Sequence, residues 1–194
     1  MILIIISFIT LIGCTGELKY TYEEYKKIKF LDAGKESEFI PENELEEDNL
    51  NQEELQSYLD DLNDYNSYIK KFTSIYDKYT NELLALFDSF DNEQQDIDKK
   101  NQYANSIIDY EEKWIADLNE FEAPSFLKKY SNFFIDFLNN EILFYTYFLE
   151  ADLVNVDISI QEADDSYNKS LIELEAVKES FNDRSEKLNF DPPF

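Results

Sequence analysis

The chain has 194 residues and a formal net charge of −26, from 43 acidic and 17 basic side chains with no histidine. The absence of histidine excludes the histidine-ligated metal sites of helical-bundle enzymes and every histidine-based triad. The negative charge argues against nucleic acid as a partner. An aromatic content of 16% argues against disorder, and only 3 Gly and 4 Pro indicate a helical chain with short connections.

The N-terminal segment combines an apolar run with the only cysteine of the chain. Residues 2–12 are almost entirely apolar, and the run closes on Leu11-Ile12-Gly13-Cys14. This junction resembles the lipobox of prokaryotic lipoproteins. The resemblance implies that residues 1–13 are a signal peptide, that the leader is cut before Cys14, and that Cys14 carries the lipid. The alternative, an uncleaved span or buried helix, has only about 12 apolar residues where a spanning helix needs about 20.

Residues 14–49 are expected to form the lipidated N-terminus and an acidic tether. Between Lys19 and Leu31 a short helix and an isolated extended strand are both possible, although a lone strand does not persist without partners. Gly34 and Pro41 interrupt regular structure, and a run of acidic residues follows. We therefore interpret this segment as a flexible spacer between the membrane and the rest of the protein.

The clearest periodic pattern predicts one long helix that starts near Asn51. Apolar and aromatic residues recur alternately three and four positions apart, which is typical of a helix with one buried stripe. The stripe consists of Leu55, Tyr58, Leu62, Tyr65, Ile69, Phe72, Tyr76, Tyr79, Leu83, Leu86 and Phe90. A two-stranded coiled coil is the alternative, but several stripe positions hold tyrosine, whose bulky ring and hydroxyl suit the edges of a helical bundle better.

Three further helices are predicted after a turn at Asp91-Asn92-Glu93. The second helix covers about Gln95 to Phe121, and Pro124 prevents its continuation. The third covers about Ser125 to Val154 and is apolar nearly all round, so we expect it to be the most buried helix. A break at Asn155-Val156-Asp157 then precedes the fourth helix.

The fourth predicted helix carries an apolar stripe from Ile160 to Leu188, and residues 191–194 form a tail. Short connections between consecutive helices make them antiparallel neighbours. Residues 50–190 are therefore expected to form an all-α, up-down-up-down four-helix bundle with a long, heptad-patterned first helix.

No motif for catalysis, cofactor or metal binding emerges from the sequence. Carboxylates are so numerous that two of them close together carry almost no information about a hydrolase site. Asp91, Glu93, Asp96 and Asp98 lack the glycine and the spacing of a calcium loop. Asn168 begins a glycosylation sequon inside a predicted helix. We therefore expect a protein that is not an enzyme, with no cofactor and no metal.

The expected function is a binding or interaction role at the cell envelope, on the extracytoplasmic face of the membrane, with the lipid as the membrane contact. An acidic surface favours a cationic peptide, protein or wall component. The candidate surface is the polar side of the fourth helix, at Glu162, Asp165, Glu173, Glu175 and Glu179. The alternative is an assembly subunit that associates through the Leu55–Phe90 helix. Burial of the stripe tyrosines by the chain's own helices would favour the first hypothesis.

Overall fold

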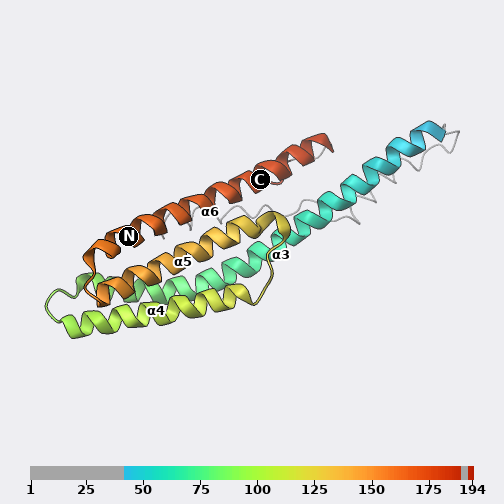
Figure 1. Ribbon diagram of the computed structural model, residues 1–194. Coiled ribbons are helices and arrows are strands. Elements are labelled where there is room, and N and C mark those ends of the chain that lie inside the picture. The colour runs from blue at the N-terminus through green and yellow to red at the C-terminus, as the bar shows by residue number, and fades with distance from the viewer. Residues whose placement is uncertain (1–41, 189–191) are drawn as a thin grey trace. The chain divides into compact units, whose positions relative to one another are not determined.

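The computed structural model describes residues 42–188 and 192–194, with side chains from residue 53 onward. This part of the chain is all-α, as the sequence predicts, and no strand occurs in it. Its helices, labelled as in Figure 1, are α3 (Glu42–Asn92), α4 (Ile97–Asn119), the short 3-10 helix η1 (Ser125–Leu127), α5 (Lys128–Leu149) and α6 (Leu153–Lys187).

The described residues divide into two compact units. Unit 1 contains residues 67–177 and unit 2 contains residues 42–66 together with the C-terminal part from residue 178. Within unit 1, the later part of α3, then α4, α5 and the first part of α6 alternate in direction (Figure 1). Unit 1 therefore has the predicted up-down-up-down arrangement of four helices.

Helix α3 begins earlier than predicted, and its apolar stripe is almost entirely buried. The helix starts at Glu42, so residues 42–49, which the sequence pattern assigned to the spacer, are helical. Every predicted stripe residue is buried except Leu86, which is partly exposed, while Phe87 beside it is 2% exposed. An α-helix has about 3.6 residues per turn rather than 3.5, so a stripe drifts away from a strict heptad over several turns. The drift brings Phe87 rather than Leu86 into the core.

The turn between α3 and α4 is capped by two acidic side chains. The carboxylate of Glu93 accepts hydrogen bonds from the backbone N–H groups of Gln95 and Asp96, at 3.2 and 3.0 Å. Asp96 is the N-cap of α4 and accepts from the N–H of Lys99 at 3.1 Å. These bonds satisfy N–H groups that have no partner within a helix.

The connection between α5 and α6 lies earlier than predicted. The third helix was expected to reach Val154, but α5 ends at Leu149. Ala151 has a φ of 57°, its N–H bonds the carbonyl of Phe148, and the N–H of Asp152 bonds the carbonyl of Tyr147. This is a Schellman C-terminal motif, which usually holds glycine where Ala151 lies.

The predicted break at Asn155-Val156-Asp157 is consequently wrong, because these residues lie inside α6. The side chain of Asp152 accepts from the backbone N–H of Asn155 at 3.3 Å. A hydrogen bond of this kind starts a helix rather than interrupting one. The third helix also starts later than expected, at Lys128, because the chain after Pro124 first forms η1.

The core of unit 1 is built mainly from aromatic rings. Phe134 of α5 is fully buried and contacts Phe72 and Trp114, with ring centroids 4.9 and 5.5 Å away. Trp114 in turn stacks on Tyr79 at 5.7 Å with an interplanar angle of 11°. These edge-to-face and stacked contacts join α3, α4 and α5 into one core.

Unit 2 has its own smaller aromatic cluster. Phe181 of α6 packs edge-on against Tyr58 and Tyr65 of α3, with centroids 6.0 and 5.6 Å away. Phe194 contacts Tyr65 at 4.9 Å. Arg184, the only arginine of the sequence, bonds Asp61 at 2.7 Å and lies 5.3 Å from the Tyr58 ring centroid. Cation–π contact and the ion pair together stabilise this cluster.

Candidate functional site

Two glutamates on neighbouring helices are buried in the core of unit 1. Glu111 of α4 has an exposed fraction of 0%, and Glu141 of α5 has one of 6%. Buried carboxyl groups are rare because an ionised carboxylate loses its hydration when it enters an apolar interior. This carboxyl pair is therefore the strongest candidate for a functional site in the described residues.

The apolar stripes of the two helices carry these glutamates into the core. On α4, Glu111 follows Ile107 by four positions and precedes Trp114 by three, and all three residues are buried. On α5, Glu141 lies four positions after Phe137 and four positions before Tyr145, and both of these residues are buried as well. A residue at such a position points the same way as its apolar neighbours. Helix periodicity therefore forces both carboxyl groups inward.

Burial and the interaction between the two carboxyl groups change the ionisation of the pair. Burial, followed by the charge of Glu141, raises the pKa of Glu111 well above its usual range. Burial raises the pKa of Glu141 to about 7; the hydrogen bond with Glu111 opposes this rise, and the charge of Asp164 on α6 adds to it. A hydrogen bond joins the carboxyl groups of Glu111 and Glu141, and it forms only when one of them is protonated, because no other described group donates to the Glu111 oxygens. The pair thus favours a protonated form over two carboxylates.

Glu141 lines a small internal cavity of about 10 Å³. The cavity is also lined by Tyr76 and Thr80 of α3, Trp114 of α4 and Tyr167 of α6, and it is otherwise apolar. This volume is at the lower limit for one water molecule and too small for an organic ligand. The arrangement can therefore hold and release a proton, but it cannot enclose a substrate.

Two further buried polar atoms lie near the carboxyl pair. The indole N–H of Trp114 and the hydroxyl of Tyr145 have no hydrogen-bond partner among the described side chains and backbone. Burial, together with the charges of Glu141 and Glu111, raises the pKa of the Tyr145 hydroxyl, so Tyr145 stays neutral and remains a potential donor. The surroundings of the pair therefore include polar atoms as well as aromatic rings.

Neither glutamate was predicted as a site residue, although the sequence contains a signal for the burial of Glu111. With 43 acidic residues in the chain, the proximity of two carboxylates by itself indicates nothing about function. A glutamate at a stripe position is more informative than a glutamate in general, because the period predicts its burial. The pattern Ile107, Glu111, Trp114, Leu118 contains such a glutamate.

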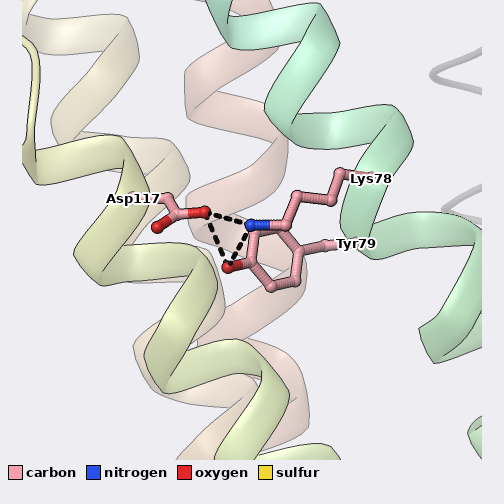
Figure 2. Close-up of polar contacts among 3 residues, drawn as sticks. All are labelled: Lys78, Tyr79 and Asp117. Carbon is pink, nitrogen blue, oxygen red and sulfur yellow. Dashed lines mark hydrogen bonds and ion pairs between the residues drawn. The ribbon is translucent and has the colours of Figure 1, made fainter.

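A polar cluster of Lys78, Tyr79 and Asp117 connects α3 to α4 (Figure 2). The ammonium group of Lys78 and the hydroxyl of Tyr79 both donate to the same Asp117 oxygen at 2.7 Å, and Lys78 also donates to the Tyr79 oxygen at 3.2 Å. These hydrogen bonds lower the pKa of Asp117. Because Tyr79 stacks on Trp114, we interpret the cluster as a structural clamp beside the aromatic core.

The five residues of the predicted acidic surface differ in exposure and belong to two different units of the structure. Glu162, Asp165 and Glu175 lie on the part of α6 that belongs to unit 1, and all three are exposed there. Glu173 is less exposed and forms an ion pair with Lys129 of α5 at 3.5 Å. Glu179 is also exposed but belongs to unit 2. Glu162 and Asp165 are therefore the best residues with which to test this surface.

Unit 2 carries an open, mixed-charge groove of about 470 Å³. Glu53, Glu54 and Ser57 of α3 and Arg184 and Lys187 of α6 line it. Arg184 is already bound to Asp61. The groove is therefore a surface feature with balanced charges, and no single chemical class of ligand follows from it.

Other sequence expectations concern metal, glycan and lipid. In the part of the chain that the structure describes, no group of three or more potential ligand residues is placed to hold a metal ion. Asp96 of the calcium-like run serves as the cap of α4. Asn168 is exposed on α6, inside a helix as expected. Cys14 and the rest of the lipobox lie outside the described residues.

None of the helices in the described residues combines the length and the apolar character that crossing a bilayer requires. Comparison of the chain with protein-family models, curated proteins and solved structures found no match.

Proposed function

We propose that this chain is a lipid-anchored protein of the extracytoplasmic membrane face, with a non-enzymatic binding role at the cell envelope. The observation that carries the proposal is the junction Leu11-Ile12-Gly13-Cys14, with the only cysteine of the chain at the end of an apolar leader. A cysteine at this place is the acceptor of lipid in the lipoproteins that the segment resembles.

The proposed partner is a cationic peptide, protein or wall component. Acidic side chains on α6, among them the exposed Glu162 and Glu175, support this class of partner. A net charge of −26 creates a negative field around the protein, which attracts cations over a distance set by the ionic strength. The competing explanation is that these residues only keep the helix solvated.

The burial of the α3 stripe favours a binding role over self-assembly through this helix. Tyr76 and Tyr79 are each 4% exposed and pack on Trp114 within unit 1. Tyr58 and Tyr65 are each 3% exposed and pack on Phe181 within unit 2. A second copy of the chain would have to displace these contacts in order to pair through the same stripe.

The anchor is tested with Cys14→Ser in a prokaryotic host that is fed labelled fatty acid. We expect the wild-type protein to incorporate label and to enter the detergent phase on phase partitioning. The variant should do neither, because serine lacks the thiol that forms the thioether. Incorporation of label by Cys14→Ser, or identical partitioning of both proteins, would refute the lipid anchor.

The acidic surface is tested by charge reversal with an oligolysine peptide as the probe. Glu162→Lys combined with Asp165→Lys should weaken binding, and the wild-type affinity should fall between about 50 and 500 mM salt because the screening length shortens. The matched control is Asp109→Lys with Glu112→Lys, which makes the same charge change at exposed positions of α4. Equal effects of the two double variants would show that only the net charge matters and that α6 is a solvated face.

A further inference from the structure

The Glu111–Glu141 pair has no positive charge from the described residues to compensate it. The negative charge of Asp164 on α6 raises the pKa of Glu141 further. Among the described groups, only Glu141 acts on the pKa of Glu111. No lysine or arginine of the described residues acts on either carboxyl group. Buried carboxylates are normally paired with a cation or satisfied by hydrogen bonds. The hydrogen bond of this pair joins its own two carboxyl groups and forms only when one of them carries a proton, so the pair needs protonation to avoid two buried negative charges.

The other titratable groups around the pair cannot supply a charge of the required sign. The tyrosines that interact with the pair or line its cavity come from three helices, and burial raises the pKa of each: Tyr76 of α3, Tyr145 of α5 and Tyr167 of α6. They stay neutral at physiological pH. The more distant Asp77 and Asp91 act on Tyr76 and Tyr145 and are acidic as well. Protonation of one or both glutamates is the remaining way to lower the charge.

We propose that Glu111 and Glu141 form a proton-binding site that is occupied near neutral pH, and that loss of its proton destabilises the packing of α4 against α5. Like charges on facing helices repel each other strongly when no water screens them. The cavity of about 10 Å³ beside Glu141 is too small to let in more than one water molecule, so relaxation requires movement of the helices. This site is independent of the proposed lipid anchor and of the acidic surface of α6.

The sign of the pH effect follows from the raised pKa values. A group whose pKa is higher in the folded state binds more protons when folded than when unfolded, so its stabilising effect is complete at low pH. The effect is lost as the pH rises through the folded-state pKa, which for Glu141 is about 7. The unfolding equilibrium constant should therefore rise by up to about ten-fold per pH unit from about pH 5 to about pH 7. The raised pKa of Glu111 contributes to the rise with the same sign.

Few other side chains of this protein change their charge in this pH range. The sequence contains no histidine, which is the side chain that ordinarily titrates between about pH 5 and 8. Exposed carboxylates complete their ionisation below about pH 5.5, an α-amino group titrates near about pH 8, and lysine and tyrosine titrate near about pH 10. A change in stability between about pH 5.5 and 7 therefore reports a shifted carboxyl group.

The experiment measures denaturant unfolding of the full chain from about pH 5.5 to 8. Glu141→Gln and Glu111→Gln mimic the protonated side chain in size and remove its charge, so both should flatten the pH dependence and exceed the wild-type stability at pH 8. The matched control is Glu112→Gln, which changes the exposed neighbour of Glu111 and should keep the wild-type profile. A wild-type profile that is flat over this range, or a control variant as flat as Glu141→Gln, would overturn the proposal.

Two measurements on the folded protein keep the proposal testable if a variant does not fold. Carbon-13 NMR of the glutamate carboxyl carbons should show a midpoint near pH 7 for Glu141 and a raised midpoint for Glu111. Ordinary midpoints for all glutamates would refute the proposal. Trp114, the only tryptophan, packs on Phe134 between α4 and α5. Its fluorescence should shift to longer wavelength as the pH rises through 7, and an unchanged emission would show that loss of the proton does not loosen this packing.

Discussion

Ala151 is the residue at which the chain reverses between α5 and α6. Its φ of 57° places it in the left-handed region, and it is the only non-glycine residue of the described chain with a positive φ. A Cβ atom in this region contacts the backbone unfavourably, which costs about 1 kcal/mol or more. The hydrogen bonds of the Schellman motif and the cap at Asp152 hold the residue there in spite of this cost.

We predict that Ala151→Gly stabilises the protein by about 1 kcal/mol, because glycine adopts this conformation without a steric cost. Urea or thermal unfolding of the two proteins measures the difference. Ala176→Gly is the matched control, because Ala176 is exposed in the interior of α6 and the same change there should destabilise by about 1 kcal/mol. Destabilisation by both substitutions would show that the turn does not strain Ala151.

Helix α5 occupies the centre of unit 1, although not in the way that its composition suggests. Its buried side chains form a stripe that includes Phe134, Leu138 and Tyr145, each with an exposed fraction of 0%. Leu143 on the same helix is 38% exposed. Apolar residues occur nearly all round this helix, which is why we expected it to be the most buried one, but neighbouring helices cover only some of its faces and leave others to solvent.

Phe134→Ala should destabilise the protein by about 3–5 kcal/mol, since a fully buried ring is lost and the rings of Phe72 and Trp114 cannot both move into its place. Phe148→Ala should cost clearly less, because Phe148 is only partly buried near the end of α5. Denaturant unfolding of both variants measures the two losses. Equal losses would contradict the central position that the structure gives to Phe134.

At the scale of the whole molecule, negative charge dominates the electrostatics. Acidic side chains outnumber basic ones 43 to 17, and the ion pairs of the described residues, such as Lys78 with Asp117, lie at or near the surface. Surface ion pairs contribute little to stability. Repulsion among the unmatched carboxylates opposes the compact state.

Added salt should therefore stabilise the fold. Raising sodium chloride from about 20 to 200 mM shortens the screening length several-fold and should increase the melting temperature. Asp109→Lys with Glu112→Lys reduces the magnitude of the net charge by four units, from −26 to −22. This double variant should therefore show a smaller increase in melting temperature on addition of salt. A melting temperature that falls with salt would indicate that ion pairs, rather than repulsion, control the electrostatic stability.

Much of the fold could be predicted because helix periodicity is a property of one segment at a time. The stripe from Leu55 to Phe90 predicted both the helix and its buried face, and its single misplaced member, Leu86, reflects the drift of a straight helix. The absence of histidine was equally decisive, because composition alone excluded whole classes of catalytic and metal sites.

The tertiary structure alone decided the position of the α5–α6 turn and the pairing of two carboxyl groups in the core. The turn depends on backbone hydrogen bonds around Ala151, where neither glycine nor proline signals a reversal. The carboxyl pair depends on which two helices face each other, because the stripe on α4 predicts burial for Glu111 but not its partner. Glu141 becomes that partner only when α5 packs against α4, since two carboxyl groups far apart in the sequence repel each other only after folding brings them together.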